Sequence, residues 1–132
     1  MSDERILIIE DETITAMDIR DMFQFWGYNT LSVASSEKEA LDMAHDIKPD
    51  LALISLGVKN NNRIDFAKKI TDNYDTAVIY VTGYFDEKMI QYMRASRPYG
   101  FISKPLDENQ LKYTVEKALY RRNLHRRIIA SK

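Results

Sequence analysis

Residues 5–12 read Arg5-Ile6-Leu7-Ile8-Ile9-Glu10-Asp11-Glu12, an apolar run that ends directly in three acids. An unbroken apolar run of this kind is typical of a β-strand that is buried on both faces of a parallel sheet. Similar short runs alternate with longer amphipathic stretches along the rest of the chain. About five strand–helix units are therefore predicted, which make one α/β domain with helices on both faces of a parallel sheet.

Local signals predict where the other elements begin and end. Further strands are expected at residues 30–34, 51–54, 77–81 and 99–102. Helices are expected at residues 13–26, from the Ser36 cap to Pro49, around 64–71, after the Asp86 cap, and from Pro105 towards Arg127. A loop is expected at residues 57–62, because asparagine and glycine favour turns. Glu39 stands three residues after Ser36, which is the spacing of a capping box. The apolar face of the first helix is predicted to hold Ile14, Met17, Phe23 and Trp26, and Gly27 to end that helix.

The composition favours a single cytoplasmic domain. The length of 132 residues suits one domain, and the absence of cysteine excludes disulfides and fits a reducing compartment. The first residues lack the layout of a signal peptide, and no apolar run approaches the ~20 residues that cross a bilayer. No membrane association is expected.

Charge is distributed unevenly along the chain. Residues 1–50 carry twelve acids and four bases, whereas residues 117–132 carry six bases and no acid. A basic segment can bind nucleic acid, and absence of binding at low salt would exclude that hypothesis. We favour a solvated helix end, because cations suit the carboxyl end of a helix dipole.

Polar residues follow the predicted strands at the points where ligands bind in doubly wound sheets. They are Glu10, Asp11, Ser55, Thr82 and Lys104. Adjacent carboxylates suit a hard cation such as Mg²⁺, and a lysine with a threonine hydroxyl suits a phosphoryl oxygen. Each residue also has a plain structural explanation, as a helix cap, a turn residue or a surface amine. Their joint placement after successive buried runs favours a site.

The order and spacing of four motifs resembles the receiver (response-regulator) domain of two-component signalling, from about Arg5 to about Leu119. The motifs are Ile8-Ile9-Glu10-Asp11-Glu12, Pro49-Asp50-Leu51-Ala52-Leu53-Ile54-Ser55-Leu56, Val81-Thr82-Gly83 and Lys104-Pro105. The resemblance implies a flavodoxin-like (CheY-like) doubly wound five-stranded parallel sheet of order 2-1-3-4-5. It also implies a receiver domain at residues 1–120, followed at 121–132 by a basic extension of the last helix or the start of a linker.

The resemblance assigns a magnesium site to the end of the first strand. Asp11 matches the direct ligand, Glu10 the acid that acts mostly through water, and the backbone carbonyl of Gly57 a further ligand. Mg²⁺ is the one cofactor that this implies.

The resemblance also assigns the residues of phosphorylation and switching. Thr82 matches the hydroxyl that contacts the phosphoryl group, and Lys104 the amine that pairs with it. Phe101 matches the aromatic residue that changes rotamer, although a core role explains a single phenylalanine as well. Pro105 matches a proline that follows a cis bond, the form that is essentially confined to proline.

Ser55 departs from the family pattern, because it stands where the family has its phosphate-accepting aspartate. Neither Asp50, before the strand, nor Asp65, in or beside the third helix, is placed to substitute for it. A serine hydroxyl is a weak nucleophile without an activating base, and no histidine is positioned to help. The site also loses a negative charge. We therefore expect no ordinary phosphotransfer and only weak Mg²⁺ binding.

These observations favour a signalling module that works by binding partners and is no enzyme. The expected partners are a sensor histidine kinase or another signalling protein, on a face formed by Met89 through Leu119. The last helix would pair two copies or lead to a fused output domain. In the main alternative, Ser55 is an engineered change in an ordinary phosphoacceptor. A flavodoxin-like cofactor binder is disfavoured, since the chain has four glycines and no glycine-rich phosphate loop.

Overall fold

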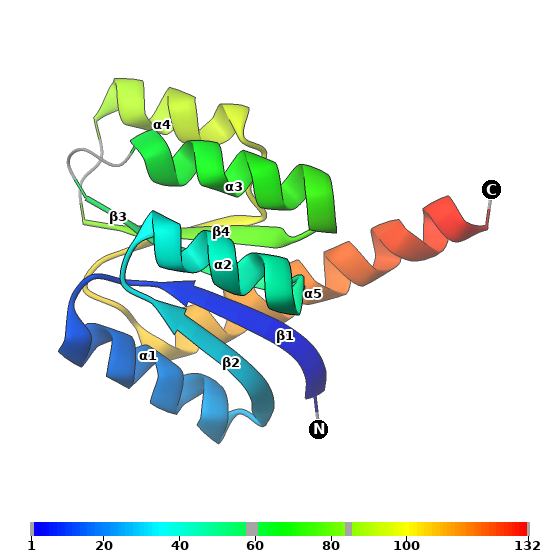
Figure 1. Ribbon diagram of the computed structural model, residues 1–132, viewed down its shortest axis with the longest axis horizontal. Coiled ribbons are helices and arrows are strands. Elements are labelled where there is room, and N and C mark those ends of the chain that lie inside the picture. The colour runs from blue at the N-terminus through cyan, green and yellow to red at the C-terminus, as the bar shows by residue number, and fades with distance from the viewer. Residues whose placement is uncertain (1, 58–60, 84–85, 132) are drawn as a thin grey trace.

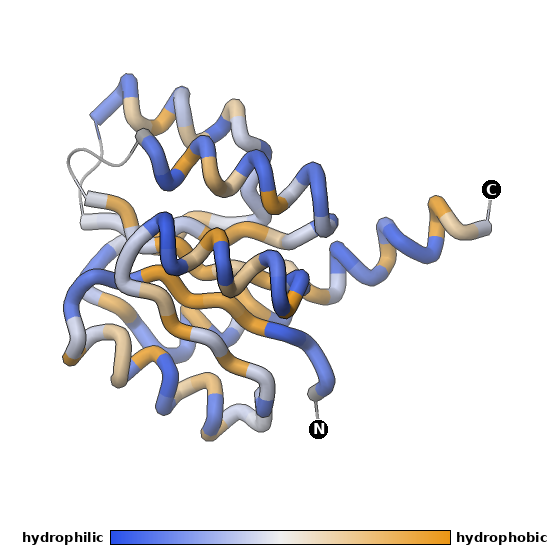
Figure 2. The backbone as a smooth tube through the Cα atoms, viewed as in Figure 1, coloured by the Kyte–Doolittle hydropathy of each residue, from blue (hydrophilic) through white to orange (hydrophobic). Residues whose placement is uncertain are grey.

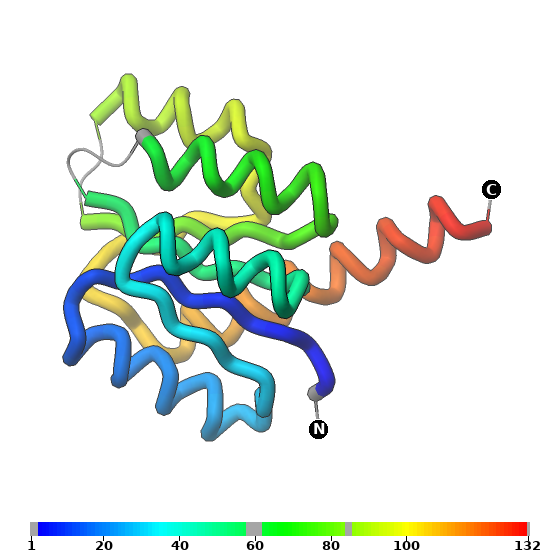
Figure 3. Tube along the Cα trace, viewed as in Figure 1, coloured from blue at the N-terminus to red at the C-terminus, as the bar shows by residue number. Residues whose placement is uncertain are grey.

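The computed structural model describes residues 2–57, 61–83 and 86–131. Five strands in these ranges form one parallel sheet. The strands are β1 (Ser2–Ile9), β2 (Tyr28–Ala34), β3 (Leu51–Leu56), β4 (Ala77–Thr82) and β5 (Gly100–Ser103). Their order in the sheet is β2-β1-β3-β4-β5, so the first strand lies inside the sheet between β2 and β3 (Figure 3). The predicted flavodoxin-like order is confirmed.

Helices cover both faces of this sheet (Figure 1). They are α1 (Thr13–Phe25), α2 (Glu37–Ile47), α3 (Asn61–Tyr74), α4 (Glu87–Ala95) and α5 (Glu108–Ala130). One core layer joins α1 and α5 to the sheet, and a second layer joins α2, α3 and α4 to the opposite face. This is the arrangement that alternating strands and helices predict.

Side chains of the central strands alternate between the two core layers. On β1, Ile6 and Ile8 belong to the layer of α1 and α5, whereas Leu7 and Ile9 belong to the layer of α2, α3 and α4. All residues of β3 and β4 are buried, and Figure 2 shows the apolar colour concentrated along the central strands. Unpaired polar groups are costly in such a core, so functional side chains are confined to the strand ends.

The predicted elements agree with the structure to within a few residues, apart from α3, which is longer than predicted at both ends. α3 begins at Asn61, inside the stretch 57–62 that was expected to be a loop, and it continues to Tyr74. Asparagine favours turns, but packing of an amphipathic face outweighs such a local preference. Part of the predicted loop, residues 58–60, lies outside the described residues.

The predicted apolar face of α1 was partly wrong. Ile14 and Met17 are 77% and 57% exposed, and the face that packs on the sheet consists of Ala16, Ile19 and Phe23. Both sets have helical spacing, so periodicity alone does not choose between them. Gly27 follows the helix with a φ of +98°, the conformation that favours glycine after a helix.

The two predicted capping residues are confirmed. Ser36 Oγ accepts a hydrogen bond from Glu39 N at 3.2 Å, and Asp86 Oδ1 accepts one from Met89 N at 2.7 Å. The carboxylate of Glu39 reaches back to Ser35 N at 2.9 Å, one residue before the capping residue itself. Ser36 is therefore the capping residue, but the return hydrogen bond of the capping box is made to Ser35 and not to Ser36.

An ion-pair cluster centred on the buried Asp50 lies at the amino ends of the strands. Asp50 Oδ2 accepts hydrogen bonds from Arg5 N at 2.7 Å and Arg5 Nε at 3.2 Å. Asp50 Oδ1 lies 2.9 Å from Nη2 of Arg122, which is fully buried and donates from Nε to the Asp75 carbonyl at 2.6 Å. Among the described residues Arg122 Nη2 has no aligned hydrogen-bond acceptor, so its attraction to Asp50 is chiefly coulombic. The cluster ties α5 to β1 and β3.

The C-terminal part of α5 projects away from the rest of the domain (Figure 1). Leu124, Ile128 and Ile129 are exposed on this part of the helix. The helix continues without a break to Ala130, so a boundary between residues 120 and 121 stays a prediction. Within the described ranges no helix is long and apolar enough to span a membrane.

We expect Asp50→Asn to lower the free energy of unfolding by about 3 kcal/mol near neutral pH, because it leaves Arg122 as an uncompensated buried charge. Burial opposes ionisation of Asp50, but the bonds from Arg5 and the charge of Arg122 hold its pKa below the ordinary value. A lowered folded-state pKa stabilises the protein above the unfolded value of about 3.9, and this contribution is lost as pH falls through the folded value. The difference in the free energy of unfolding between the unaltered protein and Asp50→Asn should therefore become smaller below about pH 4.

The measurement is urea unfolding of both proteins across this pH range. Arg126→Gln is the matched control, because Arg126 pairs with Asp75 at 2.9 Å while both side chains are nearly half exposed. Its loss should cost less than about 1 kcal/mol. An Asp50→Asn protein as stable as the control variant would contradict the role assigned to the cluster.

Candidate functional site

The carboxyl edge of the sheet brings the predicted polar residues together. Glu10 follows β1, and its Oε1 accepts a hydrogen bond from Lys104 Nζ, after β5, at 3.3 Å. Ser55 lies next to the end of β3, and the following residue, Leu56, pairs in register with Thr82 at the end of β4. Lys104 N donates to the Thr82 carbonyl at 3.0 Å. Residues that are distant in sequence therefore share one edge.

The two adjacent acids have different surroundings. Glu10 is buried, and its second carboxylate oxygen accepts a hydrogen bond from Glu12 N at 3.0 Å. The Asp11 side chain is 64% exposed and lies on the outer side of the edge. Glu10 is therefore held inside by Lys104, whereas Asp11 is open to solvent and to other charged groups.

Arg63 enters this edge from α3, and the sequence did not single it out. Its side chain is 5% exposed, and Nε donates to Glu37 Oε1 at 2.7 Å. Nη1 donates to the backbone carbonyl of Ser55 at 2.6 Å, and Nη2 donates to Asp11 Oδ1. All three guanidinium nitrogens therefore have acceptors, supplied by the segment after β1, by the start of α2 and by β3.

The charge of Arg63 is retained despite its burial. Burial by itself lowers the pKa of Arg63, but hydrogen bonds to the Asp11 and Glu37 carboxylates outweigh it and raise the pKa above its ordinary value. An arginine near the start of a predicted helix is usually exposed, and its reach depends on how α2 and α3 pack. No sequence motif marked Arg63 as a residue of this edge.

The fit of this edge to Mg²⁺ is poor. Magnesium needs several oxygen ligands in a nearly octahedral arrangement, and Asp11 Oδ1 is already bonded to a cationic side chain. The part of the chain that the structure describes holds no cluster of three histidine, aspartate or glutamate side chains arranged to bind a metal ion. Gly57, the predicted carbonyl ligand, is exposed and directly follows β3. Weak Mg²⁺ binding stays a prediction.

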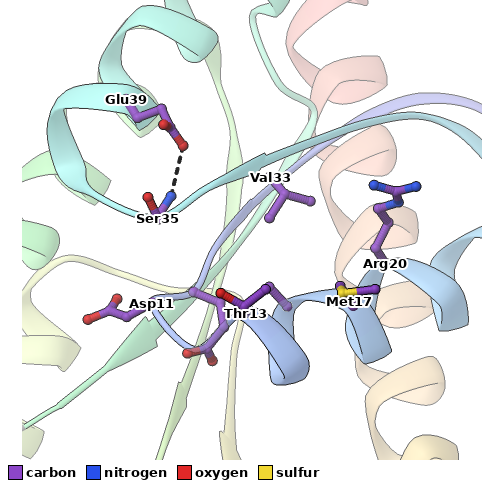
Figure 4. Close-up of a pocket in the computed structure, with 9 residues that line it drawn as sticks. Asp11, Thr13, Met17, Arg20, Val33, Ser35 and Glu39 are labelled. Carbon is purple, nitrogen blue, oxygen red and sulfur yellow. Dashed lines mark hydrogen bonds between the residues drawn. The ribbon is translucent and has the colours of Figure 1, made fainter.

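A small open pocket of about 210 Å³ lies beside Asp11, between α1, the end of β2 and the start of α2. Figure 4 shows Met17 and Arg20 on its α1 side and Val33 on β2, with Glu39 bonded to Ser35 at the α2 side. The exposed position of Met17 places an apolar side chain at this pocket. The lining is mixed in character and provides no concentrated set of catalytic groups.

The predicted switch residue Phe101 is 39% exposed and lies on β5. Its ring centroid is 6.2 Å from that of Tyr80, and it borders a shallow hollow with Ile90, Met93 and Arg94 on α4. A change of its rotamer stays a prediction. The Lys104–Pro105 peptide bond is cis, as the resemblance implies.

Comparison with known proteins agrees with this fold. The model of the response regulator receiver domain family matches residues 6–116, and the chain therefore belongs to that family. The chain is 26% identical over 117 residues to the transcriptional regulatory protein PdtaR of Mycobacterium tuberculosis, an alignment that covers 89% of this chain but 57% of PdtaR. The chain thus spans little more than half the length of that relative.

Two further similarities cover nearly the whole of the matched proteins. The chain is 29% identical over 121 residues to the sporulation initiation phosphotransferase F of Bacillus subtilis, covering 90% of this chain and 96% of that protein. The crystal structure of a CheY-like response regulator receiver domain protein from Methanospirillum hungatei superposes with a TM-score of 0.85 at 22% identity. It covers 94% of this chain and 99% of that one, and at this identity it shows the fold alone.

The buried ring of Tyr80, next to Phe101, allows a test of the packing between β4 and α4. Ser96 Oγ donates to the Met93 carbonyl at 2.6 Å, so the 2.6 Å contact between Tyr80 and Ser96 is a hydrogen bond donated by Tyr80. Burial raises the pKa of Tyr80 to about 12, and burial likewise raises the pKa of Tyr28 to about 12. The stability that these raised values represent is present below about pH 10 and is lost as pH rises towards 12.

Alkaline titration, followed by tyrosinate absorbance, should show a fraction that ionises near pH 12. Tyr80→Phe and Tyr28→Phe should each remove part of this fraction. Tyr80→Phe should also cost about 1 kcal/mol of stability through the lost hydrogen bond. A late fraction unchanged by both substitutions would show that neither ring is buried as described.

Proposed function

We propose that the chain is an atypical receiver module of a two-component or phosphorelay system, which acts by binding signalling partners and does not accept phosphate at Ser55. The observation that supports this most directly is the identity and bonding of residue 55. It is a buried serine at the end of β3, and its backbone carbonyl accepts a hydrogen bond from Arg63.

The chemistry of phosphoryl transfer supports the same proposal. A hydroxyl attacks an acyl phosphate or phosphohistidine only when a base removes its proton. The acids at this edge are engaged by cations: Glu10 by Lys104, and Asp11 by Arg63. His45 and His125 lie on α2 and on the projecting part of α5, so neither histidine is close enough to act as the base.

Partner binding is proposed for the face formed by α4, β5 and α5, from Met89 through Leu119. Phe101 is partly exposed on this face, beside a hollow that α4 borders. The partner is a sensor histidine kinase or another signalling protein. The projecting end of α5 would join two copies or lead to an output domain, in keeping with the greater length of PdtaR, which is named as a transcriptional regulator.

The alternative is an ordinary phosphoacceptor in which Ser55 replaces an aspartate by design. It predicts that Ser55→Asp alone restores phosphate uptake, because the serine would be the one altered group.

The test is incubation with a small acyl-phosphate donor and Mg²⁺, followed by intact mass measurement. We expect the unaltered chain to gain no phosphoryl group, because serine lacks an activating base. Ser55→Ala is the matched control for modification at other residues. A phosphoryl group on the unaltered chain that is absent from Ser55→Ala would overturn the proposal, and uptake by Ser55→Asp would favour an altered ordinary receiver.

A further inference from the structure

We propose that the guanidinium of Arg63 is a built-in cation that takes the place of a divalent metal at the carboxyl edge, so that this receiver site is assembled without magnesium. The proposal rests on the proposed function in one respect, namely that this edge is the receiver site. It concerns a residue to which neither the motifs nor the family resemblance gives a role.

The hydrogen-bonding capacity of the Arg63 guanidinium is used by oxygen acceptors of the same chain. Its three nitrogens donate to Glu37, to the Ser55 carbonyl and to Asp11. A guanidinium is planar and presents its donors in a fixed fork, so these acceptors must converge on one plane around it. A bound magnesium ion would also draw on oxygens at the ends of β1 and β3, but in an octahedral and not a planar arrangement.

The charges at the edge support the same conclusion. Glu10 and Asp11 contribute two negative charges, and Lys104 and Arg63 contribute two positive charges. Glu37, on the rim, adds one further negative charge beside Arg63. With serine at residue 55 that position adds no further carboxylate, so these five groups carry a net charge of about −1, and a dication would make the edge net positive.

Arginine makes this arrangement permanent under ordinary conditions. Its guanidinium does not lose its proton in proteins, and its side chain is almost wholly buried in the contact. A dication that bound Asp11 would have to approach this fixed positive charge or displace it into solvent. Approach is unfavourable because like charges repel, and displacement is unfavourable because it breaks the hydrogen bonds of Arg63 to Glu37, Ser55 and Asp11.

The contacts of Arg63 also hold neighbouring elements of the domain together. Arg63 lies on α3 and bonds to a residue of α2, to a residue of β3 and to the segment after β1. The relative positions of α2 and α3 at the carboxyl edge are therefore set by an internal contact rather than by the concentration of a metal. The proposal predicts a site whose state does not respond to magnesium.

The test is calorimetric titration with magnesium chloride of the unaltered chain and of Arg63→Ala. The unaltered chain should show no saturable binding in the millimolar range. Arg63→Ala frees Asp11 and removes the opposing charge, and it should bind at least about tenfold more tightly than the unaltered chain. Arg126→Ala is the matched control, since it removes an arginine paired with an acid at the other end of the sheet and should leave magnesium binding unchanged.

A second variant tests whether the new binding uses the intended ligand. Asp11→Asn in the Arg63→Ala background should abolish the gain in magnesium affinity. Equal magnesium affinity of the unaltered chain and a folded Arg63→Ala variant would overturn the proposal.

A measurement on the unaltered chain covers the case in which Arg63→Ala does not fold. The NMR signal of the Arg63 Nε–H group should exchange slowly with water and keep its position when magnesium chloride or a chelator is added. A saturable shift of this signal and of the Asp11 amide would overturn the proposal.

These outcomes are distinct from those of the phosphorylation test. Phosphate uptake at Ser55 without magnesium binding would reject the proposed function and leave the role of Arg63 intact. Magnesium binding by the unaltered chain without phosphate uptake would reject the role of Arg63 and leave the proposed function intact.

Discussion

Burial of the central strands on both faces is the constraint on which the rest of the structure depends. The residues of β3 and β4 and the apolar run of β1 pack into two core layers, one beneath α1 and α5 and the other beneath α2, α3 and α4. A buried polar group needs a partner, so charged residues can appear only where a strand begins or ends. The parallel direction of all strands then collects these residues at two opposite edges.

Each edge contains a buried arginine that arrives from a helix. Arg122 of α5 meets Asp50 at the amino edge, and Arg63 of α3 meets Asp11 and Glu37 at the carboxyl edge. Removing one partner of such a contact leaves the other charge buried without a counter-charge, which destabilises the fold. The two contacts differ in consequence, because ligands of doubly wound sheets bind at the carboxyl edge. The amino-edge contact positions α5, whereas the carboxyl-edge contact engages Asp11, the predicted direct ligand of Mg²⁺.

Several features of this receiver were accessible from the sequence, and others were not. The strand order follows from the family resemblance, and the caps of α2 and α4 follow from Ser36 and Asp86. The face of α1 was misjudged because Ile14 and Met17 repeat with the same helical period as the residues that are buried. The start of α3 was missed because asparagine is locally a turn residue, while packing of the helix is a tertiary effect.

The sequence by itself determined which strands exist, which residues end them, and that Glu10, Asp11, Ser55, Thr82 and Lys104 share one edge, because buried runs and their polar ends are local patterns. Only the tertiary structure decided how these residues are bonded. Glu10 turns inward to Lys104, and Asp11 turns outward to Arg63. The reason is physical: the reach of a long side chain depends on how neighbouring helices pack, and no local pattern encodes the position of α3 relative to the end of β1.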